Sequence, residues 1–510
     1  MARGNRKKAY AARSRNGCQA CRIRHIKCDE APGSCINCRS AGWTCDYDYN
    51  VHKLPRTASA SVSTTAAAAA DISDIATRGL PMTADERRCF SYFQHRLIAS
   101  LTGLFDAPFW QQRVLQLYRY DAAVFHAVNM LSAVHEECEE HGMQMSDAVL
   151  CTERVRLFSL QQSTRAVALL ARRLASHDPQ LRSIVLLCCL LFVLADVLRT
   201  HYHRAWMHLR SGLRIIAELE THGQLDSVDP SLIAVFRRLD IQASLYGAAS
   251  HPILCTDNTL PLDRLLPPCD GPPFTTLDHA QEVLASLLER GIPFISTVLA
   301  LFPTKPVAQS EYASLHLTQG RLLSAFTQFA ERLALFTSTH VLVTEKHRRG
   351  AHIMHCLTIG QILVLRTCLF QGPVPPSFIP EYRAVLEAHE SHLAGFSHRP
   401  TLVLNHGVIA NMYVLATRCP DISLRVRAIR LLRAWPHYEG LHSSSIAALL
   451  ALDILRKEYT FLDSSLQITA EENLFLVHFL RSVQNGTHSC SALNSVVCTK
   501  YYTALLNRMA

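Results

Sequence analysis

The feature that most constrains this chain is a dense set of cysteines near its start, spaced Cys-x2-Cys-x6-Cys-x6-Cys-x2-Cys-x6-Cys. The six residues are Cys18, Cys21, Cys28, Cys35, Cys38 and Cys45. A Cys-x2-Cys pair lets two thiolates meet one metal ion from a tight turn, and thiolates are soft ligands that suit Zn²⁺. Two separate tetrahedral sites need eight ligand positions, so six cysteines hold two ions only when two sulfur atoms bridge both. A single zinc ion on four cysteines is the alternative, but it leaves the repeated spacing unexplained.

The two halves of this repeat match in spacing but differ in charge. The first half carries four basic or titratable side chains, Arg22, Arg24, His25 and Lys27. The second half carries Arg39 alone. Metal binding must supply the folding free energy of so short and apolar-poor a segment. A metal site that only stabilises the fold does not require a difference in charge between the two halves. We therefore expect the first half to face an anionic partner.

The basic excess covers the first fifty residues, which hold ten Lys or Arg and four Asp or Glu, a net +6 out of +9 for the chain. Six of these cations precede the cysteines: Arg3, Arg6, Lys7, Lys8, Arg13 and Arg15. Such an excess indicates a polyanionic partner, which is a nucleic acid or, less often, an anionic membrane surface. We predict that residues 1–17 are a disordered basic arm that contacts phosphates and directs nuclear import; a solubilising tail is the alternative.

The chain of 510 residues is long enough for two or three folded units. The predicted small domain covers residues 18–50. Residues 51–82 are predicted to be a flexible linker, because residues 56–70 are, apart from Arg56 and Val62, a low-complexity run of Ser, Thr and Ala. This linker also lacks the heptads of a dimerising coiled coil.

Residues 83–510 are predicted to form a large all-α domain. Thr83 and Glu86 have the spacing of a capping box, which marks the start of a helix. Apolar residues then recur at helical spacing, as in Trp206, Leu209, Leu213, Ile216 and Leu219. Strand-like alternation is missing, and Pro-rich stretches at 261–273 and 373–380 predict two long loops.

Membrane and secretory classes are not expected. There is no N-terminal signal sequence, and the longest apolar run, Ile184 to Ala195, is twelve residues, shorter than the about 20 of a membrane span. We interpret this run as a buried helix. The twelve cysteines outside the cluster are interpreted as small buried hydrophobic residues of a reducing compartment.

Enzyme motifs are weak. No phosphate-binding loop and no nucleophile elbow is present, and His135 and His141 lie six residues apart, which does not suit zinc on one helical face. The segment between these histidines is interpreted as a solvated acidic helix end. Four arginines at near-helical spacing are interpreted as a solvated helix face: Arg425, Arg427, Arg430 and Arg433.

The cysteine spacing together with C-R-x-R-H-x-K-C-D-E resembles the fungal Zn2Cys6 binuclear-cluster transcription factors. Segments 86–137, 200–216 and 419–444 resemble the helical regulatory domain of the same factors. The resemblance implies a mainly α protein with a small zinc-cluster domain of two short helices and loops. It also implies two Zn²⁺ bridged by Cys18 and Cys35, the first cysteine of each half.

For function, the resemblance implies a nuclear regulator of RNA polymerase II genes, not an enzyme. The first helix would enter the major groove of double-stranded DNA, commonly at CGG triplets, with contacts from Arg22, Arg24, His25, Lys27, Arg15 and Arg39. The best-known base reader of the family is a Lys four residues after the second cysteine, where this chain has His25. Neutral His offers one donor, so we expect a weaker, pH-sensitive reading of guanine and a larger share of the affinity on Arg24 and Lys27.

The sequence is also compatible with functions other than DNA binding. A zinc-stabilised interaction module, or a redox or metal sensor, competes with the DNA-binding reading, although neither requires the charge asymmetry. The chain is expected to bind DNA as a monomer or as a homodimer through the helical domain. Coregulators, a small-molecule effector and control of a biosynthetic gene cluster are family-level expectations.

Overall fold

The computed structural model describes residues 18, 21, 26–31, 35–40, 82–143, 152–173, 178, 180–245, 253–254, 273–301, 309–340, 342, 344–370 and 372–458. The chain divides into two compact units, Met1–Ser73 and Asp74–Ala510. The predicted arm and almost all of the predicted linker lie outside the described residues, so the boundaries 1–17, 18–50, 51–82 and 83–510 stay predictions.

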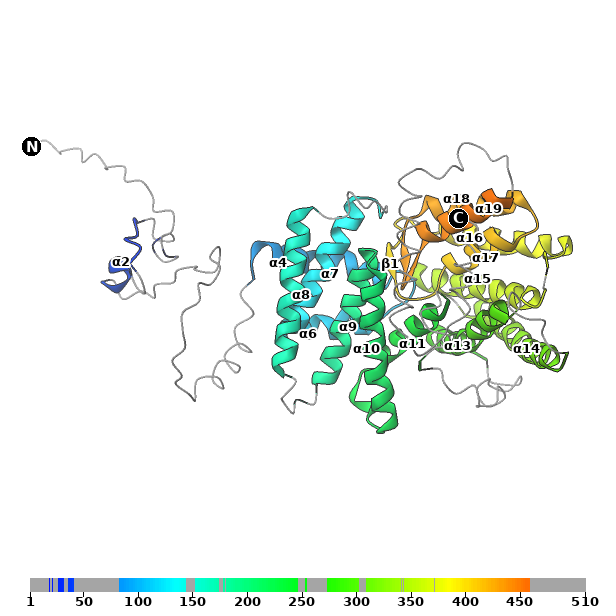
Figure 1. Cartoon of the computed structure of the whole chain (residues 1–510), viewed down its shortest axis with the longest axis horizontal. Helices are drawn as coiled ribbons and strands as arrows, with labels where there is room; N and C mark the ends of the chain where they lie inside the picture. Colours follow the sequence, from blue (N-terminus) through cyan, green and yellow to red (C-terminus); the bar gives the residue numbers. More distant parts are fainter. Residues whose placement is uncertain are drawn as a thin grey trace, which may run out of the picture. The chain divides into compact units, whose positions relative to one another are not determined.

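The large unit is helical through nearly all of its described part (Figure 1). Its first half contains α4 (Ala84–Tyr92), η1 (Phe93–Leu97), α5 (Ile98–Leu101), η2 (Phe109–Arg113), α6 (Val114–Tyr120), α7 (Ala122–Glu140), α8 (Glu153–Arg173), α9 (Leu181–Leu198), α10 (Tyr202–Thr221), η3 (Leu225–Ser227) and α11 (Pro230–Leu245). Its second half contains α13 (Leu277–Leu301), α14 (Gln309–Thr339), α15 (Glu345–Thr367), η4 (Pro376–Phe378), α16 (Ile379–Ala394), β1 (Leu402–Val403), α17 (Ile409–Arg418), α18 (Ile422–Ala434), β2 (Tyr438–Glu439), β3 (His442–Ser443) and α19 (Ser444–Glu458).

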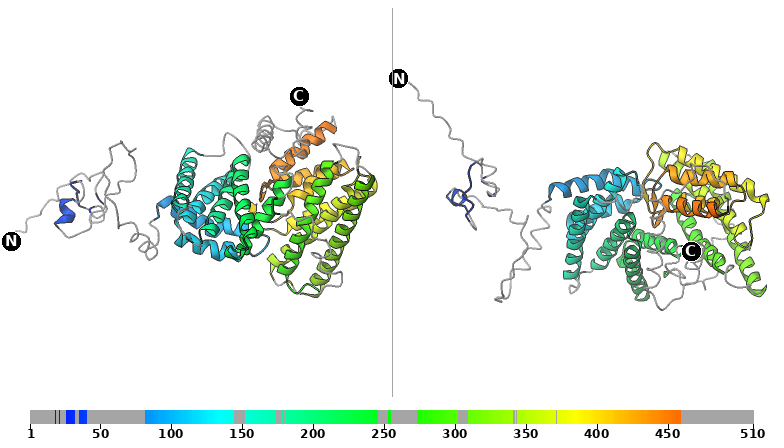
Figure 2. Two further views of the ribbon diagram at one scale, coloured as in Figure 1. Left: turned by 60° about the horizontal axis from the view of Figure 1, so that its bottom comes forward. Right: turned by 45° about the horizontal axis from the view of Figure 1, so that its top comes forward.

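Two hydrophobic cores organise these helices. The first core is built mainly from α4 to α11, and the second mainly from α13 to α19. The two sets of helices form two neighbouring groups in every view, with the long helices α14 and α15 side by side in the second (Figures 1 and 2). The predicted all-α domain is therefore one unit with two cores.

Local sequence signals account for the ends and faces of several helices. Thr83 accepts a hydrogen bond from the Glu86 N–H at 3.2 Å, and the Glu86 carboxylate accepts from the Thr83 N–H at 2.8 Å, so the predicted capping box is confirmed at the start of α4. The apolar residues predicted on 206–219 are all buried along one face of α10. The second Pro-rich stretch is not a long loop: it holds η4 and the first turn of α16, where Pro380 occupies a position that tolerates a missing N–H.

Helix α9 lies at the centre of the first core. Its length and composition alone would let it cross a membrane, with a mean hydropathy of 2.5, but 72% of it is buried inside the protein. Its buried side chains point all round the helix, which is the pattern of a core helix enclosed by neighbours. The interpretation of residues 184–195 as a buried helix is confirmed.

Helix α8, in contrast to α9, buries few apolar side chains. Its buried side chains are Ser159, Gln162 and Ala166, whereas Leu157 and Leu160 are 47% and 58% exposed. Gln162 donates to the Glu86 carboxylate at 2.8 Å and contacts Nδ1 of His126 at 2.5 Å. The contact of α8 with the rest of the first core is therefore partly polar, while a stripe of its apolar side chains faces outward.

A three-stranded sheet, which the sequence did not predict, joins the two cores. Strand β1 pairs in parallel with β2, and β2 pairs antiparallel with β3. Each strand has two residues, too few to show a period-two pattern. Leu402 and Tyr438 belong to the first core and Val403 to the second, so the sheet lies at the boundary between them.

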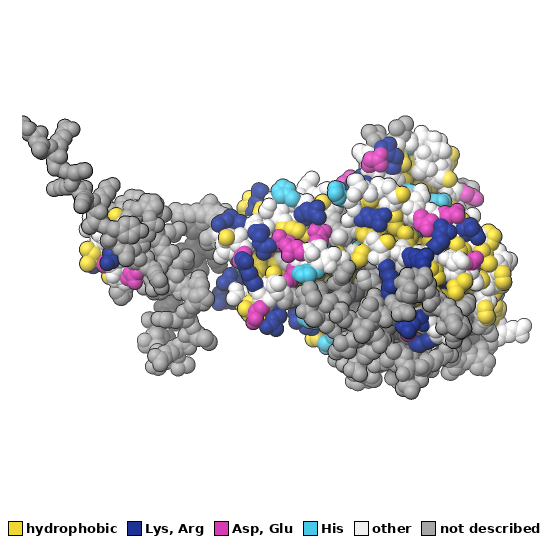
Figure 3. Space-filling model, turned by 90° about the horizontal axis from the view of Figure 1, so that it is seen from above, with side chains coloured by type: hydrophobic (Ala, Val, Ile, Leu, Met, Phe, Trp, Pro, Cys, Tyr) yellow, Lys and Arg dark blue, Asp and Glu magenta, His cyan; other side chains and the backbone are white. Residues whose placement is uncertain are grey.

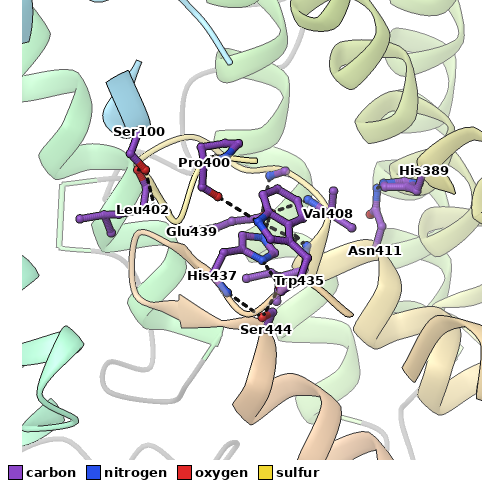
Figure 4. Close-up of polar contacts among 12 residues, drawn as sticks. Ser100, His389, Pro400, Leu402, Val408, Asn411, Trp435, His437, Glu439 and Ser444 are labelled. Atoms are coloured by element: carbon purple, nitrogen blue, oxygen red, sulfur yellow. Dashed lines mark hydrogen bonds and ion pairs between the residues drawn. The ribbon is translucent and has the colours of Figure 1, made fainter. Parts of the chain in front are cut away.

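The carboxylate of Glu439 in β2 is the polar centre of this junction (Figure 4). It is 1% exposed and accepts hydrogen bonds from the N–H groups of Gly407 at 3.0 Å, Val408 at 2.6 Å and Ile409 at 3.2 Å. These are orphan donors at the start of α17, where a negative charge is favourable. Burial opposes ionisation, but hydrogen bonds from His437 and from the Val408 N–H outweigh it and hold the pKa of Glu439 below its ordinary value.

His437 connects Glu439 to the rest of the junction. Its ring stacks on Trp435 at 3.6 Å between centroids, and its Nε2 lies 3.1 Å from a Glu439 oxygen (Figure 4). Its Nδ1 lies 2.7 Å from the Trp435 carbonyl oxygen. Each ring nitrogen thus lies within hydrogen-bond distance of an acceptor oxygen. His437 and Glu439 thus form a buried contact whose geometry is set by directional interactions.

Two sequence interpretations in the large unit were wrong. The helix end at 135–141 is not simply solvated: His135 is fully buried between the Tyr92 hydroxyl at 2.8 Å and the Thr401 hydroxyl at 3.2 Å. Burial lowers the pKa of His135 to about 4, so it is a neutral core residue. Among the four arginines, Arg425 is 4% exposed, and its Nε donates to the Ala416 carbonyl at 2.7 Å.

The remaining described cysteines agree with their interpretation. Six are buried and one is half-buried: Cys89, Cys138, Cys188, Cys356, Cys368 and Cys419, with Cys189 at the boundary. Burial raises the pKa of the Cys89 and Cys356 thiols to about 12. They are unreactive core side chains.

Candidate zinc centre

The sulfur atoms of the first five cysteines converge in the small unit. Cys18, Cys21, Cys35 and Cys38 are fully buried, and Cys28 is 3% exposed. The Sγ atoms of Cys18, Cys21, Cys28 and Cys35 all lie within 4.8 Å of one another. The predicted sixth ligand, Cys45, lies outside the described residues.

The sulfur–sulfur separations identify the chemistry of the cluster. Cys18 Sγ lies 3.7 Å from Cys35 Sγ, 3.6 Å from Cys38 Sγ and 3.8 Å from Cys28 Sγ, and Cys21 Sγ lies 3.6 Å from Cys35 Sγ. A disulfide would require about 2.05 Å. A tetrahedron of sulfurs about 2.3 Å from a zinc ion has edges of about 3.8 Å, so the donor set fits zinc.

Each of these four close pairs includes Cys18 or Cys35. The predicted bridging of two zinc ions by these two residues is compatible with these contacts and stays a prediction. Burial raises the pKa of the Cys21 and Cys35 thiols, and a cation at the centre would reverse this by favouring the thiolates.

Short backbone elements aim the sulfurs inward. Cys35 caps the four-residue helix α2 (Ile36–Arg39): its Sγ accepts from the Cys38 N–H at 3.3 Å, which turns both thiols to the same side. Cys21 lies in helical backbone, and the Ile26 N–H donates back to its carbonyl at 3.1 Å. The Cys18 N–H and the Glu30 N–H donate to the Cys28 sulfur at 3.5 and 3.4 Å. Such N–H···S bonds stabilise thiolate ligands.

Two residues that the sequence reasoning missed tie the halves together. Both oxygens of Asp29 accept from the Ile36 N–H, at 3.0 and 3.1 Å, and thereby satisfy an orphan donor at the start of α2. The Asn37 amide donates to the Lys27 carbonyl at 2.8 Å. No local signal marks this role of Asp29, because it lies seven residues before the N–H that it accepts from.

The structure places only part of the predicted DNA-contact set. The side chains of Lys27 and Arg39 are exposed, and Lys27 directly precedes the buried Cys28. Arg15, Arg22, Arg24 and His25 lie outside the described residues. Figure 3 shows cations and anions interspersed on one face of the large unit, in contrast with the basic start of the chain.

Comparison with known proteins supports the zinc assignment. Residues 16–54 match the profile of the fungal Zn(2)-Cys(6) binuclear cluster domain. The thiol cluster is the zinc centre of that domain, and the predicted zinc cofactor is confirmed.

Two curated proteins are similar to longer parts of the chain. The aspercryptin biosynthesis cluster-specific transcription regulator atnN of Emericella nidulans is 26% identical over 304 residues, which cover 56% of this chain and 48% of that protein. The transcription regulator lscL of Purpureocillium lilacinum is 27% identical over 217 residues, 41% of this chain and 51% of that protein. The chain thus spans about half the length of the curated relatives that it matches. No solved structure matches it.

Proposed function

We propose that this chain, which carries a fungal zinc binuclear cluster domain at residues 16–54, is a sequence-specific DNA-binding regulator of transcription and not an enzyme. The observation that carries the proposal is the sulfur cluster of residues 18–38, which fits zinc and lies in the most basic part of the chain. Zinc supplies the folding free energy of the small unit when bound. The cysteines then hold a short basic segment rigid enough to enter a groove of DNA.

The cations of the first half are assigned to the DNA contact. Arg22, Arg24 and His25 lie between ligand cysteines and are proposed to face base edges, while Arg15, Lys27 and Arg39 supply further contacts. The exposure of Lys27 and Arg39 is compatible with this role. Contacts to phosphate set affinity and its salt dependence, whereas contacts to base edges set specificity.

The finer proposal is a nuclear regulator of RNA polymerase II genes that recognises CGG-like sites. Control of a biosynthetic gene cluster is proposed because one relative is named as a cluster-specific regulator. Binding as a monomer, or as a homodimer through the large helical unit, is proposed because the linker lacks coiled-coil heptads.

A gel shift with the full chain tests the proposal. The probes are a random-site duplex library and a CGG-containing duplex, each with and without a zinc chelator. We expect specific binding that the chelator abolishes and that added zinc restores. Absence of binding across the library, or binding that survives removal of zinc, would contradict the proposal and favour an interaction module or a redox sensor.

Single substitutions test the division of roles. Arg24→Ala is expected to weaken binding to the selected site by roughly 5- to 150-fold at physiological salt, the range for losing a direct base contact. Arg154→Ala is the matched control, because Arg154 is an exposed arginine of the large unit paired with Asp85. Unchanged affinity for Arg24→Ala would refute the assigned role of Arg24.

A further inference from the structure

The large unit contains a pocket of about 370 Å³ between α8 and α10. Met130 of α7 and Phe192 of α9 supply apolar surface, and Val167 of α8 lines one side. Arg204 and His208 of α10 line the other side. This size falls in the range of sites that hold small molecules.

The polar feature of the pocket is Asp196 of α9, whose side chain is 3% exposed. Its Oδ1 pairs with Arg204 Nη2 at 3.0 Å. Its Oδ2 is buried and has no hydrogen-bond partner; the nearest basic atom is His208 Nε2 at 3.8 Å, beyond hydrogen-bond distance. A buried carboxylate oxygen without a donor is costly, so an O–H or N–H group delivered by a ligand would stabilise it.

The two hydroxyl groups nearby also accept instead of donating. The hydroxyls of Ser163 and Thr164 each donate to the Leu160 carbonyl, at 2.9 and 2.8 Å, so only their lone pairs remain for a ligand. His208 packs against the Phe192 ring at 5.2 Å between centroids, and burial lowers the pKa of His208, so at neutral pH it brings no fixed charge.

From this arrangement we infer that the pocket between α8 and α10 binds a small apolar molecule carrying a hydroxyl or amine donor, which hydrogen-bonds to Oδ2 of Asp196. The apolar body lies against Met130, Phe192 and Val167. The inference goes beyond the proposed DNA-binding function and does not depend on it, because the pocket belongs to the large helical unit alone.

A matched ligand pair tests the inference on the full chain without DNA. The probes are 2-phenylethanol and its methyl ether, which differ only in the donor hydrogen and one methyl group, followed by ligand-observed NMR titration. For a molecule of this size we expect a dissociation constant on the order of 1 mM for the alcohol and roughly tenfold weaker binding for the ether. Equal affinity for the alcohol and the ether would overturn the inference, and so would the absence of alcohol binding at about 10 mM.

Three variants locate the binding. Asp196→Asn is expected to abolish the preference for the alcohol. Asp226→Asn is the control, because Asp226 is exposed and lines a different pocket, and it is expected to leave the preference unchanged. Since Asp196→Asn removes a buried ion pair and risks the fold, Val167→Trp is the second test. Val167 is 51% exposed, so a larger side chain should fill the pocket and block the alcohol without disturbing the core.

Sedimentation of wild type and Val167→Trp separates a ligand pocket from a protein interface. We expect the same oligomeric state for both. A dimer that Val167→Trp converts to a monomer would assign the surface to a second copy of the chain and overturn the inference. DNA binding is measured separately, so failure of the DNA-binding proposal would leave every one of these readouts unchanged.

Discussion

Glu439→Gln should be among the most destabilising single substitutions in the large unit. The carboxylate uses both oxygens: Oε1 accepts from Val408 at 2.6 Å and His437 at 3.1 Å, and Oε2 accepts from Gly407 at 3.0 Å. Glutamine keeps the shape but replaces one acceptor oxygen by an NH₂ group. Whichever way the amide turns, that group then faces a donor.

The magnitude follows from these contacts. A hydrogen bond to a charged group contributes about 1.5–3 kcal/mol, and at least one is lost outright while the others weaken. The contact between His437 and Glu439 is also weakened, and both side chains are at most 2% exposed. Leaving a buried donor without its acceptor adds about 1–3 kcal/mol. We therefore expect a loss of about 3–5 kcal/mol in the apparent free energy of unfolding at pH 7.

Urea denaturation followed by far-ultraviolet circular dichroism measures this loss. Glu345→Gln is the matched control, because Glu345 is 68% exposed and pairs with Arg348 at the surface, where such pairs contribute at most about 1 kcal/mol. A loss below about 1 kcal/mol for Glu439→Gln would refute the reasoning that the junction depends on this charge.

The pH dependence gives a second check on Glu439. Because its pKa is held below the ordinary value in the folded state, the stabilisation is present above the unfolded-state pKa and is lost as the pH falls through the folded-state pKa. The difference between wild type and Glu439→Gln should therefore be largest near neutrality and shrink in acid. A difference that grows on acidification would contradict the assignment.

Three further predictions concern zinc, DNA and acid. Asp29→Ala removes the acceptor of the Ile36 N–H and should lower zinc affinity by roughly 5- to 30-fold. Competition with a chelating dye measures this affinity, and the control Ser40→Ala should leave it unchanged. Lys27→Ala should weaken DNA binding on all sequences alike and reduce the slope of log affinity against log salt by about 1; a change confined to one sequence would place Lys27 on a base. Burial, with His442 and Arg238 nearby, lowers the pKa of His406 to about 3. Between about pH 6.5 and pH 3 the unfolded chain therefore binds a proton that the folded chain does not, so the folded state loses stability as the pH falls. His406→Asn should make this loss of stability smaller. An unchanged dependence of stability on pH would contradict the prediction.

The parts of the molecule that could be predicted from the sequence are those set by neighbouring residues. The Cys18 to Cys38 cluster follows from spacing, because each Cys-x2-Cys pair is brought together by its own turn. The capping box at Thr83 and the buried face of α10 likewise follow from residues within a few positions of one another.

The parts that could not be predicted depend on residues distant in the sequence. His135 is buried because Tyr92 and Thr401 contact it, 43 and 266 residues away. The same holds for Arg425, whose charge is buried against Glu458, 33 residues away. The pattern of four arginines predicts an exposed face in the absence of that partner. The helical spacing of residues shows which of them share a helix face, but it does not show which distant part of the chain packs on that face.

The mostly polar buried face of α8 has a consequence for how easily this helix opens locally. Gln162 holds the helix to Glu86 of α4 and His126 of α7, and Ser159 accepts from Arg199, but these polar contacts bury little apolar area. An element with few buried apolar contacts opens at a lower free energy than the global unfolding of the domain. Amide hydrogens of α8 should therefore exchange with solvent well before those of the enclosed helix α9. One wall of the pocket that holds Asp196 would thus be the element that opens first, which gives a ligand a way in that does not require the core to unfold.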